Sequence, residues 1–334
     1  MTRSHSQPRV LLTGAGGAAA VSFIKATRDE GVVLHAADMD PLAAGLYLVP
    51  AGQRHLLLPG ADPGFVAHLL ELCRQHAIDV LVPTVDVELL GVARARDRFA
   101  SAGVRLLLAS EATLTICLDK VSLLRACEST VPVGRYAVMD ASFSPDGWAF
   151  PMIVKPRAGS GSRGVAKVPS LERLATFPLD GQLLVQEFLP GDEYSVDVLA
   201  AGDGRVVAAV PRVRLKVDSG IAVTARTLHD DELEDLACRV AARVGLSYAA
   251  NIQFRRSAAG VPTLLEVNAR FPGTMPLTVH SGVNMPLLAL RDVLGEPPPA
   301  GRLPFRDVAV VRYWTEEFIE PGVLDEWRSR GLRQ

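Results

Sequence analysis

The sequence contains only four cysteines, and they are scattered along the chain at Cys73, Cys117, Cys127 and Cys238. None of them belongs to a C-x-x-C pair, so their spacing indicates neither a zinc site nor a disulfide framework. Disulfides form in oxidising compartments, and a chain with few, unpaired thiols suits a reducing one. We therefore predict a cytoplasmic location.

The chain also lacks an excess of charge of either sign. Its 35 Lys and Arg residues nearly balance 37 Asp and Glu residues, which gives a formal net charge of -2 and a pI near 6.4. This balance argues against overall electrostatic attraction to nucleic acids or anionic membranes. A small anion such as a nucleotide can still bind where positive charge is local.

Long hydrophobic runs are missing as well, and no stretch is long and apolar enough to span a bilayer. The apolar residues at 9–12 and the small residues as far as 21 resemble a signal peptide. Gly14, Gly16 and Gly17 interrupt this stretch, so we interpret it as a strand and a turn that lead into a helix. We expect neither a membrane nor nucleic acid as a partner.

Hydrophobic residues make up 49% of the 334 positions, enough for two or three structural units with a sizeable core. Strand and helix patterns alternate in the first part, which predicts a parallel sheet with helical crossover connections. We expect strands at 10–12, 32–37, 80–82 and 104–108, and helices at 18–30 and 64–76. The prediction is a Rossmann-like domain over residues 1–112.

Strand patterns dominate the later part of the chain, which predicts an α+β arrangement. We expect helices at 114–129 and 230–244, and strands at 152–155, 165–168, 183–188, 194–200 and 308–314. The strands at 183–188 and 194–200 are expected to form a pair around a turn at 189–193. We divide this part into a smaller unit at 113–190 and a C-terminal unit at 191–334.

The most informative segment is an apolar strand at 264–270 that carries polar side chains on one face. Side chains two residues apart in a strand point the same way, so Glu266 and Asn268 present their oxygens together. Leu265 and Val267 are expected to face the opposite side, and Arg270 follows just beyond. Mg²⁺ prefers oxygen ligands and keeps water or phosphate oxygens in its remaining positions. The strand therefore predicts a magnesium site.

Residues 251–255 alternate polar and apolar side chains in the same way, and 256–260 has the composition of a turn. Antiparallel pairing of the two strands would bring the amide oxygen of Gln253 beside Glu266 and Asn268. The alternative is an amphipathic hairpin whose polar face is merely solvated.

A lysine followed by a glycine and serine loop forms a second motif. Lys155 ends a buried strand, and the loop at 158–164 follows it. Such a lysine can reach phosphate oxygens, while backbone N–H groups of the loop close over them. The order differs from a Walker A motif, in which the lysine follows the loop. A plain hairpin turn is the alternative.

Two weaker motifs flank turns. Residues 14–19 follow a strand and open a helix, and the next strand ends with Asp38, which resembles a dinucleotide-binding fingerprint. A tight turn without a cofactor explains this pattern equally well.

Acids lie at both ends of the turn at 189–193, because Glu187 precedes it and Glu193 is its last residue. Backbone groups there could recognise adenine, and a carboxylate could hold ribose. Acids beside a Pro-Gly turn are also ordinary solvated residues.

The order of these motifs is more specific than any one of them. They run Asp119-Lys120, Lys155 before the glycine loop, Gln186-Glu187 to Glu193, Gln253, and Glu266-x-Asn268-x-Arg270. From about Val10 to Gly282 the chain resembles the ATP-grasp superfamily, and most of all its carbamoyl-phosphate-synthase-like branch. The resemblance implies a Rossmann-like pre-ATP-grasp domain followed by a two-part ATP-grasp fold, in which the turn at Gly14 contributes to substrate binding rather than NAD binding.

The resemblance also implies which residues contact ATP. They are Lys120, Lys155, Gly159, Ser160, Gly161, Ser162, Gly164, Glu187, Phe188, Leu189, Glu193 and Gln253. The two lysines would contact the phosphates and the glycine loop would cover them. Residues 187–189 would form the adenine hinge, and Glu193 would hold the ribose.

The resemblance further assigns the metal and the chemistry. Gln253, Glu266 and Asn268 would bind one or two Mg²⁺ ions, for which Mn²⁺ can substitute. Lys155 and Arg270 are the predicted catalytic residues, with Arg270 stabilising the transferring phosphoryl group. Proteins of this type activate a carboxylate as an acyl phosphate, which an amine then attacks.

The predicted function is therefore an ATP-dependent ligase that joins a small-molecule carboxylate to an amine, both amino-acid-like, and releases ADP and phosphate. Three alternatives stay open: a nucleotide-binding regulatory or partner protein, an enzyme that phosphorylates a carboxylate or carbamate, and an NAD-dependent enzyme. A homodimer is compatible with the resemblance.

Several further residues are candidates for substrate contacts. Residues 272–286 follow the metal strand and should border the acceptor site. Thr84, Asp86 and Glu88 lie just beyond the carboxyl end of a parallel strand, where α/β sheets bind ligands, and are candidate substrate contacts. A basic run comprises Arg212, Arg214, Lys216 and Arg226, which would meet phosphate or carboxylate or else form an exposed strand face.

The ligase chemistry needs no histidine, so we interpret His35, His55, His68 and His76 as structural or surface residues.

Overall fold

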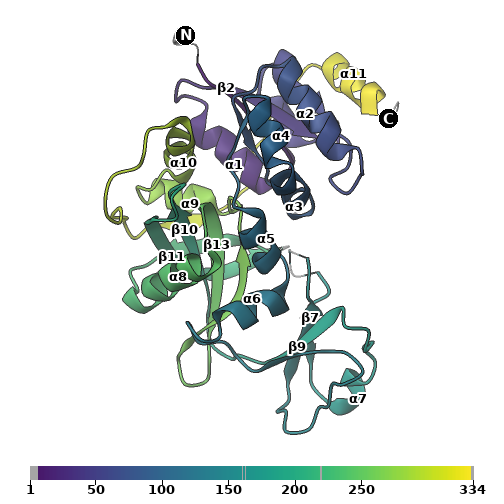
Figure 1. Ribbon diagram of the computed structural model, residues 1–334, viewed down its shortest axis with the longest axis vertical. Helices are drawn as coiled ribbons and strands as arrows, with labels where there is room; N and C mark the ends of the chain where they lie inside the picture. The colour runs from purple at the N-terminus through teal and green to yellow at the C-terminus, as the bar shows by residue number, and fades with distance from the viewer. Residues whose placement is uncertain (1–6, 160, 162, 219, 332–334) are drawn as a thin grey trace.

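The computed structural model in Figure 1 describes residues 7–159, 161, 163–218 and 220–331. Its N-terminal part is a parallel sheet in the order β3-β2-β1-β4-β5. The strands are β1 (Arg9–Leu12), β2 (Val33–Asp38), β3 (Arg54–Leu56), β4 (Val80–Val82) and β5 (Arg105–Leu106). The helical elements are α1 (Ala18–Thr27), η1 (Ala44–Leu48), η2 (Ala51–Gln53), α2 (Phe65–Gln75), α3 (Asp86–Arg94) and α4 (Arg96–Ser101). The predicted Rossmann-like sheet is confirmed.

The strand order reverses between β1 and β4, and a crevice opens beyond the carboxyl ends of such neighbouring strands. The turn after β1 and the turn after β4 are tied together there. The backbone N–H of Thr13 donates to the carbonyl of Val82 at 3.3 Å, and the Thr84 hydroxyl donates to the carbonyl of Thr13 at 2.8 Å. The two turns therefore form one continuous wall.

A smaller antiparallel sheet with the order β6-β9-β7-β8 lies at the opposite end of the molecule (Figure 1). Its elements are β6 (Tyr136–Val138), β7 (Met152–Pro156), β8 (Ala166–Val168), the short helix α7 (Leu171–Leu174) and β9 (Leu183–Glu187). Met152, Val154 and Val185 are fully buried in its separate apolar core. The predicted strands at 152–155 and 165–168 are thus confirmed as β7 and β8, which pair antiparallel on either side of the glycine loop.

The third sheet is antiparallel, with the order β14-β13-β10-β11-β12-β15. Its strands are β10 (Glu193–Ala200), β11 (Val206–Asp218), β12 (Ile221–Thr227), β13 (Tyr248–Arg256), β14 (Pro262–Asn268) and β15 (Ala309–Val311). The helices of this part are α8 (Asp231–Val244), α9 (Met275–His280), α10 (Met285–Leu294) and α11 (Pro321–Gly331). Asp230 caps α8 by accepting from the Leu233 N–H, so the predicted helix at 230–244 is confirmed with its start shifted by one residue.

The parallel sheet and the six-stranded region share one apolar core. Phe23 of α1 meets Phe271, which follows β14, edge to face with ring centroids 5.1 Å apart, and both rings are buried. Aromatic pairs prefer this geometry. The contact holds the middle of α1 against the segment that follows the predicted metal strand.

The predicted helix at 114–129 is wrong in one respect, because the structure has two helices there, α5 (Glu111–Cys117) and α6 (Lys120–Cys127). Asp119 lies between them with an extended backbone, and its carboxylate accepts from the N–H of Val121. An aspartate in this role begins a new helix. Lys120 is consequently the first residue of α6 rather than a residue inside a long helix.

The predicted pairing of 183–188 with 194–200 is also wrong. β9 belongs to the four-stranded sheet and β10 to the six-stranded sheet, so residues 188–192 cross from one sheet to the other. Local sequence pattern gives two strands and a turn but does not determine which sheet each strand joins. As a result Glu187 and Glu193 lie on different walls of one cleft.

The last part of the chain contains elements that the sequence pattern did not predict. α9 and α10 occupy the segment expected to border the acceptor site, the last strand is confined to β15, and α11 returns to the N-terminal part, where Figure 1 shows it beside α2. Within the described residues no helix is long and apolar enough to cross a membrane.

Candidate active site

Two adjoining cavities lie along the six-stranded sheet. The first opens between that sheet and the four-stranded sheet, and the second opens between it and the turns after β1 and β4. Arg163, Gln253 and Glu266 line both cavities. The two spaces therefore meet at residues that the sequence predicts to bind metal.

The hairpin of β13 and β14 brings the predicted metal ligands together. Gln253 pairs with Glu266 and Asn251 pairs with Asn268 in the antiparallel register. The Asn268 amide donates to Glu266 Oε1 at 3.3 Å, and the Gln253 amide donates to Asn251 Oδ1 at 3.2 Å. This register confirms the predicted hairpin and places amide and carboxylate oxygens on one face.

One detail of that strand was predicted wrongly. The register shifts between Gln253 and Phe254, so Phe254 pairs with Leu264 and Leu265 is the extra residue of a β-bulge. A bulge interrupts the alternation of side chains, and Leu265 lines the first cavity together with Glu266 instead of facing the opposite side.

Two buried lysines flank the Glu266 carboxylate. Lys120 Nζ lies 3.6 Å from Glu266 Oε2 and donates to the carbonyl of Gly159 at 2.9 Å. Lys155 Nζ lies 3.5 Å from the carbonyl of Leu265. Burial lowers the pKa of Lys155 to about 8, the Glu266 carboxylate opposes this shift, and the Lys120 ammonium adds to it. The first cavity thus has a cationic end at the junction.

Several other predicted nucleotide residues lie along the same cavity, whereas Gly161 lines the second. Glu187, Phe188 and Leu189 line it from the crossing segment, and Gly159 lines it from the loop. Gly159, Gly161 and Gly164 have φ angles of 119°, 69° and 73°, which favour glycine. Ser160 and Ser162, also predicted to cover the phosphates, lie outside the described residues.

Glu193 lies on the opposite wall of the first cavity, at the start of β10. Its carboxylate pairs with Arg214 and, at 3.6 Å, with Arg255. Arg214 also donates to the Gln253 amide oxygen at 3.3 Å. The predicted ribose ligand is therefore held by cations and linked to the metal face.

Gln186, which the motif order includes without a role, also lines the first cavity. The residue is 2% exposed, and its Nε2 makes no hydrogen bond to any residue in the described ranges. A buried donor without an acceptor carries a free-energy cost. An acceptor atom of a bound ligand in this cavity would remove that cost.

Arg270 crosses the second cavity to the parallel sheet. Its guanidinium binds both carboxylate oxygens of Asp86, with Nε to Oδ1 at 2.7 Å and Nη2 to Oδ2 at 3.0 Å. Asp86 begins α3, directly after the turn that follows β4, and Thr84 and Asp86 both line the cavity. This bidentate pair joins the predicted catalytic arginine to a predicted substrate contact.

Glu88, the third residue expected at that strand end, is 4% exposed and faces inward. It accepts from the Thr13 hydroxyl at 2.5 Å and from the N–H groups of Thr84 and Val85 at 3.0 Å each. Burial raises the pKa of Glu88 to about 7, against these hydrogen bonds. Glu88 therefore holds the wall of the cavity together.

The turn after β1 contributes to the second cavity through Gly17, Ala18 and Ala19. Asp38, the acid of the dinucleotide-like pattern, accepts from the Gly16 N–H at 2.8 Å and so supports the turn. Gly14 has a φ of 61°, and a side chain there would collide with Val85.

The sequence pattern also did not predict a buried polar network around Asp197, which includes Asn251, the strand partner of Asn268. Asp197 is fully buried and accepts from Arg212 at 3.1 Å, from the Asn251 amide at 2.7 Å and from the Thr278 hydroxyl at 2.6 Å. A lone acid within the apolar strand 194–200 was the available signal. Of the predicted basic run, Arg212 and Arg214 line the second cavity, while Lys216 and Arg226 are exposed.

This network predicts a large stability effect. Replacing Asp197 with alanine leaves the Arg212 guanidinium buried and unpaired, so we expect unfolding free energy to fall by about 3–5 kcal/mol. Chemical denaturation measures it, with Asp203→Ala in an exposed turn as the control. A loss below about 1 kcal/mol would show that the pair contributes little.

Two family models match the chain. "PylC-like, N-terminal domain" matches residues 10–107, and "ATP-grasp in the biosynthetic pathway with Ter operon" matches residues 180–317. The first covers the parallel sheet, and the second covers most of the six-stranded region.

Two curated relatives match parts of the chain. A D-alanine–D-alanine ligase of Ectopseudomonas mendocina is 32% identical over 196 residues, which cover 51% of this chain and 59% of the ligase. A carbamoyl phosphate synthase large chain of Thermoanaerobacter sp. is 28% identical over 215 residues, 58% of this chain and 20% of that protein. The chain spans 49–59% of the length of three of the D-alanine–D-alanine ligases that it matches.

A solved structure extends the comparison to most of the chain. The biotin carboxylase domain of the Hydrogenobacter thermophilus 2-oxoglutarate carboxylase was solved as a dimer with MgADP, ADP and bicarbonate. It superposes with a TM-score of 0.72 at 16% sequence identity, covering 89% of this chain and 72% of that chain. At this identity the superposition demonstrates a shared fold.

Proposed function

Because the chain has the ATP-grasp fold behind a PylC-like N-terminal domain, we propose that it is an ATP-dependent, ADP-forming carboxylate–amine ligase. The observation that carries the proposal is the meeting of two cavities at Glu266 and Gln253. The first has a lysine-rich end suited to phosphates, and the second contains the arginine and the acid suited to a zwitterionic substrate.

The roles follow from these positions. ATP occupies the first cavity. Its adenine base contacts residues 187–189, and its phosphates contact Lys120 and Lys155. A buried lysine that donates to a carbonyl can transfer that hydrogen bond to a phosphate oxygen at little cost in reorganisation. The γ-phosphate then lies at the junction, next to the second cavity.

The metal donors fit a hard cation. Glu266, Asn268 and Gln253 offer carboxylate and amide oxygens on one strand face, which is the donor set that Mg²⁺ and Mn²⁺ accept. When bound, such an ion neutralises charge on the transferring phosphoryl group. The residues present therefore fit the metal that the function needs.

The reaction has two steps. A substrate carboxylate oxygen attacks the γ-phosphorus of ATP, and the bond between that phosphorus and the β–γ bridging oxygen breaks, which gives an acyl phosphate and ADP. The amine then attacks the acyl carbon, phosphate leaves with the electrons of the C–O bond, and a proton is lost from nitrogen. Arg270 lines the second cavity, which adjoins the junction, and stabilises phosphoryl charge in the first step.

The second cavity supports an amino-acid-like substrate. Arg212, Arg214 and Arg270 offer cations for a carboxylate, and Asp86 offers an anion for an ammonium group. Guanidinium groups bind carboxylates in a bidentate manner, which fixes orientation as well as charge.

A screen for ADP release tests the proposal. The protein with Mg²⁺ and ATP is mixed with amino acids singly and in pairs, and we expect ADP and phosphate with an amide product for at least one pair. ADP formation without an amine would point to a carboxylate- or carbamate-phosphorylating enzyme. Tight ATP binding without turnover would indicate a regulatory nucleotide-binding protein, and thermal protection by NAD instead of MgATP would overturn the nucleotide assignment.

The lowered pKa of Lys155 predicts how ATP affinity depends on pH. Polyphosphate favours the ammonium form, so affinity should be level below about pH 7 and fall as pH rises through the lysine pKa of about 8. Calorimetric titration across this range measures it. The Lys155→Arg variant keeps its charge and should lose this dependence. Equal pH dependence in both proteins would contradict the role of Lys155.

Two further expectations accompany the function. A cytoplasmic location fits the four free cysteines, of which Cys73, Cys117 and Cys127 are buried. A homodimer stays a prediction of the resemblance, and sedimentation of the full chain measures it.

A further inference from the structure

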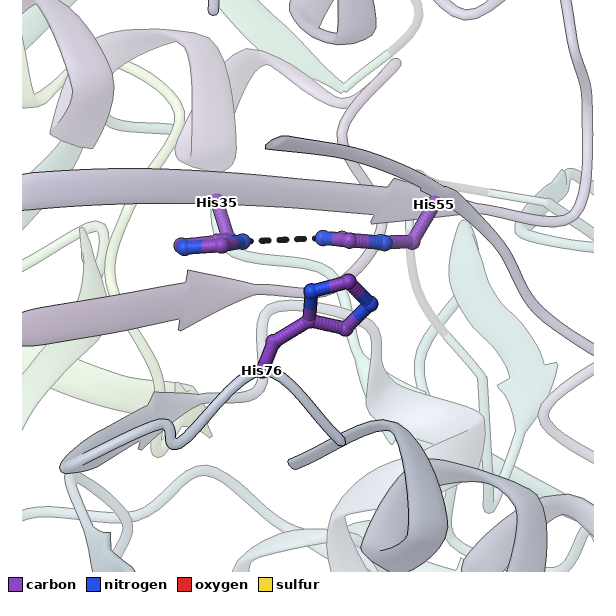
Figure 2. A group of neighbouring side chains, drawn as sticks. All are labelled: His35, His55 and His76. Atoms are coloured by element: carbon purple, nitrogen blue, oxygen red, sulfur yellow. Dashed lines mark hydrogen bonds between the residues drawn. The ribbon is translucent and has the colours of Figure 1, made fainter. Parts of the chain in front are cut away.

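Three histidines converge in the N-terminal domain, away from the residues that line the two cavities. His35 lies on β2, His55 on β3, and His76 follows the last residue of α2. Figure 2 shows a ring nitrogen of His76 directed toward the gap between the facing nitrogens of His35 and His55. One ring nitrogen from each histidine lies within 4.8 Å of the other two.

The contacts within this cluster are close. His35 Nδ1 and His55 Nε2 are 2.9 Å apart and share a hydrogen bond, and the two rings are nearly parallel, with an angle of 10° between their planes. The His55 and His76 ring centroids are 4.2 Å apart. His35 is fully buried and His55 is 7% exposed, while His76 is half-buried and gives access from solvent.

Burial keeps the imidazoles of His35 and His55 neutral. It lowers the pKa of His35 to about 4 and the pKa of His55 to about 3, and the positive Arg9 contributes to both shifts. Neutral imidazole is the form that binds transition metals. Protonation of these two rings therefore does not compete with a metal ion near neutral pH.

We propose that His35, His55 and His76 bind a divalent transition-metal ion such as Zn²⁺, independently of the magnesium site. Three imidazoles are a recognised zinc donor set, whereas Mg²⁺ and Ca²⁺ prefer oxygen ligands. The ion would cross-link β2, β3 and the end of α2. A solvent molecule completes the coordination on the side of His76.

The geometry requires a small adjustment. Zn–N bonds of about 2.0–2.1 Å place tetrahedral donors about 3.4 Å apart. The His35 and His55 nitrogens, at 2.9 Å, need to separate slightly, while the third nitrogen has to approach. Rotation of the half-buried His76 ring supplies this approach without moving a strand.

Arg9 opposes metal binding in a testable way. Its Nη2 lies 3.1 Å from His35 Nε2, and because a guanidinium only donates, the proton of neutral His35 is assigned to Nδ1, facing His55. A metal ion at Nδ1 moves that proton to Nε2, where Arg9 can no longer donate. Glutamine at position 9 could accept from Nε2–H and remove the positive charge, as acceptor partners of zinc-bound histidines do.

The test titrates Co²⁺ and Zn²⁺ into the full chain after treatment with a chelator. A Glu266→Gln background removes binding at the proposed magnesium site. We expect one equivalent of Co²⁺ to give the visible absorption of a tetrahedral nitrogen site, and Zn²⁺ to raise the melting temperature. His76→Ala should weaken Zn²⁺ binding by at least about 10- to 100-fold, and Arg9→Gln should tighten it.

The matched control is His68→Ala. It removes a different half-buried histidine, which lies within α2, and should leave binding unchanged. His76 is partly exposed, so its variant is expected to fold, and cooperative thermal unfolding checks this. Absence of the Co²⁺ spectrum, or equal Zn²⁺ affinity in the wild type and His76→Ala, would overturn the proposal and leave a hydrogen-bonded packing cluster.

Discussion

Replacing Glu266 with glutamine should reduce ATP turnover about 1000-fold or more, with little effect on folding. The substitution keeps the size of the side chain but removes the only acidic group among the three predicted metal ligands, whose other members are Gln253 and Asn268. It also removes the anion 3.6 Å from Lys120. Charge stabilisation of this kind contributes several kcal/mol to transition states, and each 1.36 kcal/mol is about tenfold in rate.

ADP release at saturating Mg²⁺ and substrates measures this effect, and thermal unfolding verifies that the variant is folded. Glu296→Gln alters an exposed glutamate outside both cavities and serves as the control. Turnover of Glu266→Gln within about tenfold of the wild type would remove Glu266 from the metal site and weaken the proposed function with it.

Replacing Arg270 with alanine should lower kcat by about 1000-fold or more, because an arginine that stabilises a transferring phosphoryl group has an effect of that order. Lysine should restore little of the loss. The guanidinium binds Asp86 through two hydrogen bonds at 2.7 and 3.0 Å, and a lysine ammonium cannot reproduce that planar arrangement.

Variants of Asp86 distinguish its role in positioning Arg270 from the direct role of Arg270 in phosphoryl transfer. Asp86→Asn should lower kcat less than Arg270→Ala, and the double variant should resemble Arg270→Ala alone, since the two groups act as one unit. Arg226→Ala changes an exposed arginine of β12 and is the control. Additive losses in the double variant would contradict the proposed positioning by Asp86, and a normal kcat in Arg270→Ala would remove Arg270 from the reaction.

The sequence predicted those parts of the site that depend on local periodicity. Alternation along 251–255 and 264–270 predicted the hairpin, and its register places Gln253 opposite Glu266. The same reasoning misplaced Leu265, because a bulge adds one residue and shifts the alternation. Local pattern also predicted the strands β9 and β10 but not that they belong to different sheets.

Contacts between segments that are far apart in the sequence could not be predicted from it. The Arg270–Asp86 pair joins residues 184 positions apart, and Asp197 meets Asn251 and Thr278 across three elements. The histidine cluster has the same origin, since each histidine alone looked like an ordinary structural or surface residue. Which side chains meet depends on sheet order and helix packing, which a single sequence does not specify.

The crossing between β9 and β10 has a mechanical consequence. The chain enters the four-stranded sheet through residues 132–135, where Val133 bridges to Leu264 and the Arg135 carbonyl accepts from the Glu187 N–H, and it leaves through 188–192. These adjacent segments are the two covalent connections of the small sheet to the rest of the chain. With a base bound at residues 187–189, as we propose, nucleotide binding is expected to be coupled to the orientation of the small sheet.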